Sequence, residues 1–224
     1  MRDKIKDAIS KTKEYYVPSK KYDSEELPPE KEVKKLRKEN EKLQKEFFEQ
    51  VRDKFSTRRS VRSYSQRPVD DKTIFDCLDA ALNSPAAGNI QDFRVILVKD
   101  DEAKKKIAQL ALDQCWIADA PVVAVVVRDD KQMNMVYPQF GERYSLQNVS
   151  AFITAFIYMI HFAGYSTCWV EACEEGVLKE YLEIPSTKEI DAIIPIGYPM
   201  EIPKVEKVTL HDICYFEKHG KKKR

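Results

Sequence analysis

The stretch Arg58-Arg59-Ser60-Val61-Arg62 carries three guanidinium groups and one hydroxyl within five residues. Arginine holds a fixed charge on a planar fork of donors that fits phosphate oxygens, so this cluster is a candidate phosphate clamp. Three arginines beside a helix end are also typical of a solvated surface. The phosphate interpretation gains weight from a second segment, Ser84-Pro85-Ala86-Ala87-Gly88-Asn89, a loop of small residues where backbone can approach a flat ligand closely.

Composition limits the class of protein. The chain has 224 residues and 26.0 kDa, enough for one well-buried domain plus an appendage. Its net charge of +1 gives no global field that would favour nucleic acid or a membrane surface. Five cysteines without metal-ligand spacing and three dispersed histidines predict neither a disulfide framework nor a metal site. With alternating charges after Met1 and no visible secretory signal, we expect a reduced, cytoplasmic protein.

The distribution of charge predicts three regions. Residues 1–45 form a charged, partly helical N-terminal extension, residues 46–216 the folded domain, and residues 217–224 a basic, solvated tail. Within the extension and the start of the domain, apolar positions follow helical spacing: Val33, Leu36, Asn40, Leu43, Phe47, Val51 and Phe55. This stripe is too short and interrupted to predict a coiled coil. It would be covered by a second copy of the chain or by an outside protein partner.

Periodicity predicts the remaining elements. Helices are expected from Asp70 or Asp71 to Ala81, over 100–112 and over 144–162, and strands over 93–99, 121–127, 166–170 and 191–197. Residues 128–143 are polar and expected to be irregular. Helix 144–162 is nearly uncharged but is interrupted by polar residues: Gln147, Asn148, Ser150, Thr154 and His161. It should therefore lie in a core, with His161 packed inside, or in a core shared with a second subunit, and not in a membrane.

Because strands and helices intermix without strict alternation, an α+β fold is favoured. Five segments stand in a fixed order: RRSVR (58–62), SPAAGNIQDFR (84–94), WIADAPVV (116–123), GYSTCWVEA (164–172) and IPIGYP (194–199). Together they resemble the nitroreductase family from about Phe47 to Asp212. The resemblance implies a central, mainly antiparallel sheet flanked by helices, and a homodimer with a shared helical core. It also implies FMN as cofactor and NADH or NADPH as reductant.

The resemblance assigns roles around FMN. Arg58 and Ser60 would hold the phosphate with support from Arg59, and Arg62 would face the pyrimidine edge. Loop residues would reach the flavin bound mainly by the other subunit: Pro85, Ala86, Ala87 and Asn89. The remaining contacts would be Gln114 at the ring edge, Val170, Glu171 and Ala172 around N5, and Lys207 as a second phosphate cation. Lysine at this position, usually arginine in relatives, loses the bidentate fork.

Catalytic roles are expected for few side chains, because the cofactor carries the chemistry. Arg62 would stabilise the anionic reduced flavin, and Glu171 would either donate a proton at N5 or contribute its backbone alone. Tyr137, Phe140 and Arg143 are candidates for contact with the small-molecule acceptor. No glycine fingerprint follows a strand, which favours FMN over FAD.

The predicted function is ping-pong reduction of electron-poor acceptors, such as nitroaromatics or quinones, by NAD(P)H. Two alternatives remain: a reductive dehalogenase or flavin-processing enzyme of the same fold, and a non-catalytic flavin-binding scaffold whose N-terminal helix docks a partner.

Overall fold

The computed structural model describes the backbone of residues 30–222 and the side chains of residues 37–222. The chain divides into two compact units, Met1–Thr57 and Arg58–Arg224. Residues 1–29 of the extension expected over 1–45, and the last two residues of the basic tail, lie outside the described residues. The division expected at residues 45 and 46 stays a prediction.

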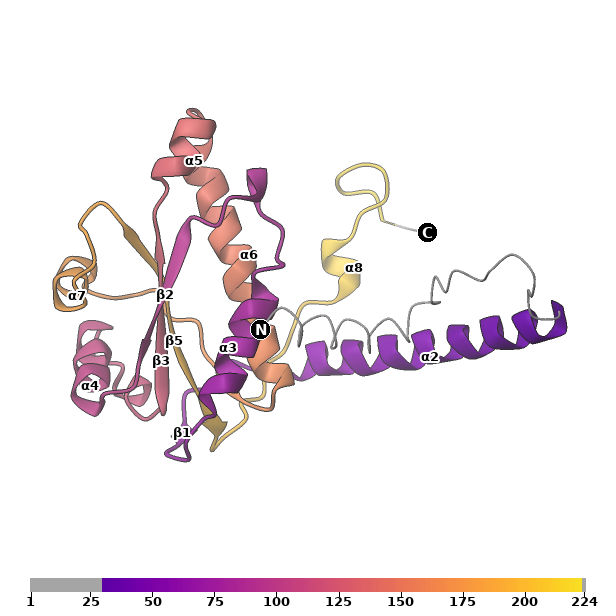
Figure 1. Cartoon of the computed structure of the whole chain (residues 1–224), viewed down its shortest axis with the longest axis horizontal. Helices are drawn as coiled ribbons and strands as arrows, with labels where there is room; N and C mark the ends of the chain where they lie inside the picture. The colour runs from indigo at the N-terminus through magenta and orange to yellow at the C-terminus, as the bar shows by residue number, and fades with distance from the viewer. Residues whose placement is uncertain (1–29, 223–224) are drawn as a thin grey trace, which may run out of the picture. The chain divides into compact units, whose positions relative to one another are not determined.

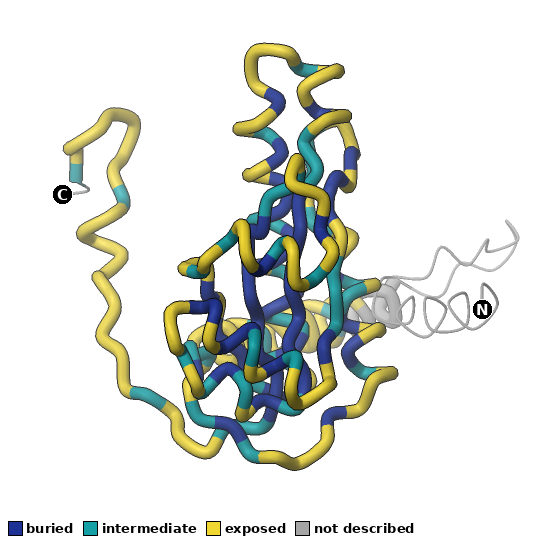
Figure 2. Tube along the Cα trace, turned by 90° about the vertical axis from the view of Figure 1, so that its left-hand side faces the viewer, coloured by how far each residue is buried: buried dark blue, intermediate teal, exposed yellow. Residues whose placement is uncertain are grey.

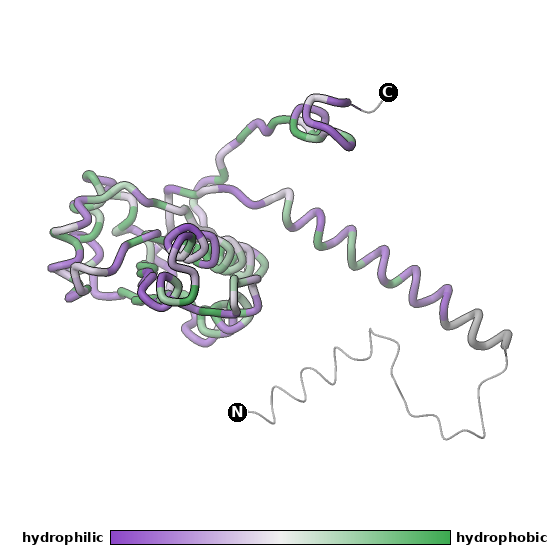
Figure 3. Tube along the Cα trace, turned by 90° about the horizontal axis from the view of Figure 1, so that it is seen from above, coloured by the Kyte–Doolittle hydropathy of each residue, from purple (hydrophilic) through white to green (hydrophobic). Residues whose placement is uncertain are grey.

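The first unit contributes one long helix, α2 (Glu30–Thr57). The helical spacing of positions Val33 to Phe55 predicts this helix. Figure 3 shows hydrophobic positions recurring between hydrophilic ones along its described length. Leu43, Phe47 and Phe48 are among its exposed large apolar side chains. Its charged positions form local pairs such as Lys42 with Glu46 at 3.7 Å, which add little to stability at an exposed surface.

The second unit is built on an antiparallel sheet of five strands. These are β1 (Tyr64–Ser65), β2 (Phe93–Val98), β3 (Val122–Arg128), β4 (Ser166–Thr167) and β5 (Glu189–Pro199). The order is β1-β5-β3-β2, and β4 pairs with β5 beside this path. Every residue of β3 is buried, as expected for its apolar run over 122–127 in a strand covered on both faces, and the buried Arg128 at its end pairs with Asp191.

Helices cover both faces of the sheet (Figure 1). The helical elements are α3 (Asp71–Ala81), η1 (Ala87–Asn89), α4 (Asp101–Leu110), η2 (Cys115–Ile117), α5 (Lys131–Val136), α6 (Gly141–Phe162), α7 (Glu175–Tyr181) and α8 (Leu210–Ile213). Helices α3 and α6 lie on one face, and α4 and α7 on the other. Alternate residues of β3 therefore enter two separate cores. The α+β architecture predicted from the sequence is confirmed.

Helix α6 supplies the centre of the larger core. Its Phe152 ring stacks on Phe93 of β2 at 4.2 Å between centroids, and Phe156 and Ile153 are fully buried beside it. Among the helices of residues 30–222, α6 is the one long and apolar enough to cross a membrane by composition. Its buried face packs against the sheet, which explains that composition. His161 was expected inside the core, but it is only half-buried.

Side-chain caps fix where two helices begin. Asp70 accepts the backbone N–H of Thr73 at 2.9 Å, and Asp100 accepts that of Ala103 at 2.8 Å. Each carboxylate satisfies a donor that the first helical turn leaves without a partner. The capping aspartate of α3 is thus Asp70, one of the two residues the sequence offered.

Two expectations about local structure are wrong. Residues 128–143 are not irregular, because they contain α5 and the start of α6. One turn and a half of helix is too short for periodicity to reveal. Gly141 lets the two helices meet, since a side chain there would collide with the backbone of Asn134. The strand expected over 166–170 is also shorter: β4 ends at Thr167, and Val170 forms an isolated bridge with Ile193.

Candidate active site

The arginine segment is anchored to the sheet by its backbone. Val61 N–H donates to the carbonyl of Thr167 at 3.0 Å, and Ser60 forms a parallel bridge with Thr167. Val61 is buried at this junction, whereas Arg62 is exposed. The alternation of a strand-like segment therefore sends the polar side chains of positions 58, 60 and 62 away from the buried Val61.

The thiol of Cys168 shows that these side chains converge. Burial raises the pKa of Cys168, while the charge of Arg62, a hydrogen bond from Ser60 and the charge of Arg58 lower it in part. Two groups predicted to hold the phosphate, Arg58 and Ser60, and the group predicted to face the pyrimidine edge, Arg62, therefore all lie near this thiol, which directly follows β4. The thiol still stays protonated at neutral pH, because burial is the larger effect on its pKa.

Aromatic rings hold the two outer arginines. The guanidinium of Arg58 lies over Tyr158 of α6 at 5.8 Å, and that of Arg62 over Trp116 at 5.7 Å. Among side chains 37–222, no carboxylate lies within ion-pair distance of Arg58 or Arg62. By contrast, the poorly exposed cations Lys104, Arg128 and Lys179 each pair with a carboxylate. Cations positioned by rings and left without acidic partners can accept an anionic ligand.

Gln114 lies close to this cluster along the chain, two residues before Trp116. Its side chain donates to the carbonyl of Ala111 at 2.8 Å. The preceding residues Leu112 and Asp113 both adopt left-handed backbone, with φ of 58° and 57°. Such conformations cost of the order of 1 kcal/mol each and often occur at functional sites. The strained turn carries the chain from α4 into η2 and brings Trp116 against Arg62.

The small-residue loop is held from α6. Asn148 accepts the N–H of Ala87 at 2.8 Å, and the loop turns through Gly88 and Asn89 with φ of 62° and 53°. Pro85 and Asn89 are exposed, while Ala86 and Ala87 are half-buried. The structure does not bring this loop to the arginine cluster of the same chain: Asn148 and Tyr158 are ten residues apart on α6, or roughly 15 Å along its axis.

Pairing within the sheet leaves fewer of the three predicted backbone amides available to donate to flavin N5. Val170 N–H donates to Ile193 at 3.0 Å, so this amide is already bonded. Among the described residues, the amides of Glu171 and Ala172 have no backbone acceptor, and both residues are exposed. Lys207 lies on an exposed segment after β5, with no described hydrogen bond to the arginine cluster.

Of the three substrate candidates, Tyr137 and Phe140 lie between α5 and α6, and Arg143 lies in the first turn of α6. Tyr137 and Phe140 pack against Tyr144, with centroid distances of 5.3 and 5.7 Å, and Arg143 is exposed. A side chain at Gly88 would come within 3.0 Å of the Tyr137 hydroxyl. The aromatic group Tyr137–Phe140–Tyr144 therefore borders the small-residue loop.

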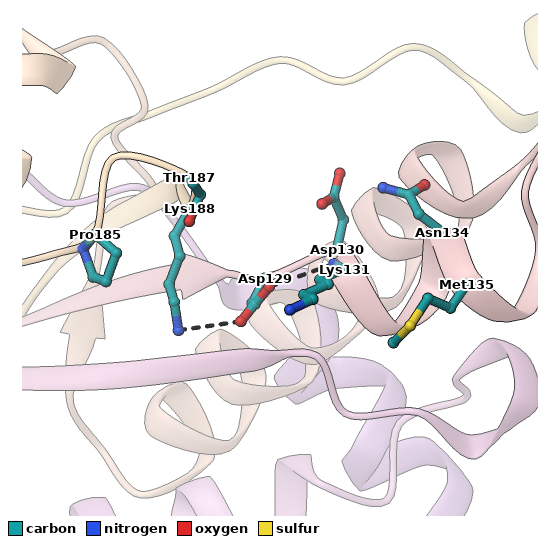
Figure 4. Close-up of a pocket in the computed structure, with 8 residues that line it drawn as sticks. All are labelled: Asp129, Asp130, Lys131, Asn134, Met135, Pro185, Thr187 and Lys188. Carbon is teal, nitrogen blue, oxygen red and sulfur yellow. Dashed lines mark hydrogen bonds and ion pairs between the residues drawn. The ribbon is translucent and has the colours of Figure 1, made fainter.

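A separate open pocket of about 820 Å³ lies at the other end of β3 (Figure 4). The arginine segment meets the sheet near Val122, the first residue of β3, whereas Asp129 and Asp130 line the pocket just after its last residue. Seven residues of strand span roughly 20 Å. Lys188 pairs with Asp129 at 3.2 Å across the pocket. None of the predicted flavin-site residues lines it.

Comparison with known proteins agrees with this fold and its motifs. The nitroreductase family matches residues 55–117 and 111–198. A Thermus thermophilus protein named NADH dehydrogenase is 30% identical over 173 residues, covering 64% of this chain and 84% of the relative. A nitroreductase-like protein from Streptococcus mutans superposes with a TM-score of 0.69 at 19% identity, covering 76% of this chain and all of that structure.

Two further relatives bear on the chemistry. A Bacillus subtilis FMN reductase [NAD(P)H] is 41% identical over 71 residues, 32% of this chain and 28% of the relative. Rat iodotyrosine deiodinase 1 is 23% identical over 198 residues, 75% of this chain and 68% of the relative. The fold and motif order define an oxidoreductase of the α+β flavoprotein class. The chain belongs to the nitroreductase family.

Three residues at the site escaped the functional interpretation of the sequence. Trp116 and Cys168 stand inside the motifs WIADAPVV and GYSTCWVEA, but neither carries a role there. Asn148 stands in the sequence as one of several polar interruptions of an apolar helix. A buried amide on such a helix is a signal that something must satisfy it.

Proposed function

We propose that this protein is an FMN-dependent oxidoreductase that takes electrons from NADH or NADPH and reduces electron-poor acceptors such as nitroaromatics or quinones. The observation that carries the proposal is that Arg58, Ser60 and Arg62 all lie near Cys168, and that neither arginine has a carboxylate within ion-pair distance among the described side chains 37–222. The names of the Bacillus subtilis and Thermus thermophilus relatives support the redox chemistry.

The residues present suit FMN. Arg58 and Ser60 would bind its phosphate, with Arg59 supporting them. Arg62, fixed against Trp116, would stabilise negative charge at the pyrimidine edge, and the amides of Glu171 and Ala172 would donate to N5. When bound, the flavin supplies reversible hydride chemistry, which lets reductant and acceptor use the site in turn. Glu171 is exposed, so its backbone is the better candidate than its carboxylate.

We propose further that two copies assemble as a homodimer. The small-residue loop contacts α6 at Asn148, and the arginine cluster contacts it at Tyr158, ten residues later. A loop from a second copy could therefore complete each site. After Pro199 the chain is almost wholly exposed (Figure 2). Its apolar residues Ile202, Val208, Leu210 and Ile213 are each more than 60% exposed. Exposed apolar area of this kind is typical of an interaction surface.

The direct test is purification. We expect yellow protein with about one FMN per chain, a dimeric mass by light scattering, and rapid NAD(P)H oxidation once a quinone is added. Protein that stays colourless after incubation with FMN would contradict the proposal. Tightly bound but unreactive flavin would instead favour the scaffold with α2 as docking helix. Loss of iodide from iodotyrosine, without quinone turnover, would favour the dehalogenase that the deiodinase relative suggests.

A cytoplasmic location is proposed, because all five cysteines are free.

Replacing Arg62 with alanine should lower the midpoint potential of the bound FMN. Its guanidinium would face a ring edge that becomes anionic only on reduction, so its loss destabilises the reduced form selectively. A loss of about 1.4 kcal/mol corresponds to about 30 mV for a two-electron couple. Redox titration at full flavin occupancy measures the shift. An unchanged potential would mean that Arg62 is not at the pyrimidine edge.

A further inference from the structure

The loop between α3 and β2 adopts a conformation that needs support. Gly88 and Asn89 are consecutive left-handed residues, and within the loop Asn89 N–H donates to Ala86 at 3.0 Å. A left-handed asparagine is strained and glycine is flexible, so the turn would exchange among several conformations in isolation. A flat ligand that contacts this backbone needs one of them fixed beforehand.

Asn148 of α6 fixes both ends of the turn. Its Oδ1 accepts Ala87 N–H at 2.8 Å, and its Nδ2 donates to the carbonyl of Ile90 at 3.2 Å. The side chain of Asn148 is only 3% exposed, and the buried residues Val149 and Phe152 beside it on α6 belong to the apolar core. One side chain thus bonds the backbone at the first residue of η1 and at the residue that follows its end.

A second polar residue one turn earlier extends the anchor. Ser145, fully buried, donates to the Asp92 carboxylate, and Asp92 in turn accepts Asp129 N–H through its carbonyl at 2.7 Å. Ser145 and Asn148 are three residues apart and therefore share one face of α6. Burying such groups is unfavourable unless they are bonded. Asn148 meets this requirement on the backbone of the loop itself, whereas Ser145 meets it on Asp92, where the chain passes from the loop into β2.

We propose that Asn148 is a positioning residue of the flavin site, which holds the backbone of Ala86–Asn89 in the conformation that meets the cofactor. The inference rests on the proposed function. Asn148 bonds to loop backbone at both ends of its amide, so it acts through the loop and not by touching the flavin.

The test compares three variants of the full-length protein. Asn148→Ala removes both bonds, Asn148→Asp keeps the acceptor for Ala87 and loses the donor to Ile90, and Gln147→Ala changes an exposed neighbour on α6 as a control. Hydrogen–deuterium exchange of residues 84–92 in the FMN-free protein reports the loop. Fluorescence titration with FMN reports affinity, and thermal unfolding of the FMN-free protein reports stability.

We expect Asn148→Ala to speed exchange of the Ala87 amide at least tenfold and to raise the Kd for FMN at least tenfold. Asn148→Asp should protect Ala87 and bind FMN with intermediate affinity, and Gln147→Ala should match the wild type. Asn148→Ala protein with faster exchange but wild-type FMN affinity would overturn the positioning role, as would unchanged exchange. If the wild type itself bound no FMN, the proposed function would fail while the exchange data still showed the loop anchored. If Asn148→Ala does not fold, Asn148→Asp decides by the same two measurements.

Discussion

The Arg58→Ala variant is expected to release FMN. Arg58 would meet a phosphate that is anionic in both redox states, and a charge-assisted contact of this kind contributes about 1.5–3 kcal/mol. The Kd should therefore rise by roughly 10- to 150-fold, with little change in midpoint potential. Fluorescence titration of the FMN-free protein measures the affinity, and redox titration at saturating FMN measures the potential.

Arg67→Ala is the matched control for Arg58. Arg67 also lies over a tyrosine ring, that of Tyr198 at 4.2 Å, but it stands outside the predicted phosphate cluster. Its loss should leave FMN affinity within about twofold, since less than 0.5 kcal/mol is usual for a surface substitution. Equal losses in the two variants would argue against a specific phosphate site. A potential shift larger with Arg58→Ala than with Arg62→Ala would show that the two arginines are assigned to the wrong ends of the cofactor.

The Phe152→Ala variant should be the most destabilised. Phe152 is 1% exposed and stacks on Phe93 at 4.2 Å, so its loss leaves a cavity between α6 and the sheet. Truncating a buried phenylalanine costs about 3–5 kcal/mol, a large part of the stability of a domain this size. Urea unfolding followed by circular dichroism gives the change in the free energy of unfolding.

Phe140→Ala provides the control for this truncation. The same atoms are removed, but Phe140 is 49% exposed and contacts Tyr144 at the surface. Its effect on the free energy of unfolding should stay below about 1 kcal/mol. Similar losses in the two variants would contradict the assignment of Phe152 to the centre of the core.

Long, regular elements could be predicted from the sequence alone. The apolar run 121–127 predicts a strand buried on both faces, and β3 is buried throughout. Asp70 and the spacing after it predict α3, and uncharged residues over 144–162 predict most of α6. These signals are local, because periodicity and caps depend on residues within a few positions of one another. The order of five short motifs then identified the family, which the comparison confirmed.

The site depended on contacts between residues far apart in the chain. Cys168 lies near Arg58, Ser60 and Arg62 because β4 and the arginine segment run side by side. No local sequence pattern reveals that pairing. Val170 loses its free amide to Ile193 across the sheet, which no motif reveals. Asn148 looked like an interruption of a helix until the loop 61 residues earlier was found bonded to it. The sequence determines which groups are available, but only tertiary packing decides which of them remain free to bind a ligand.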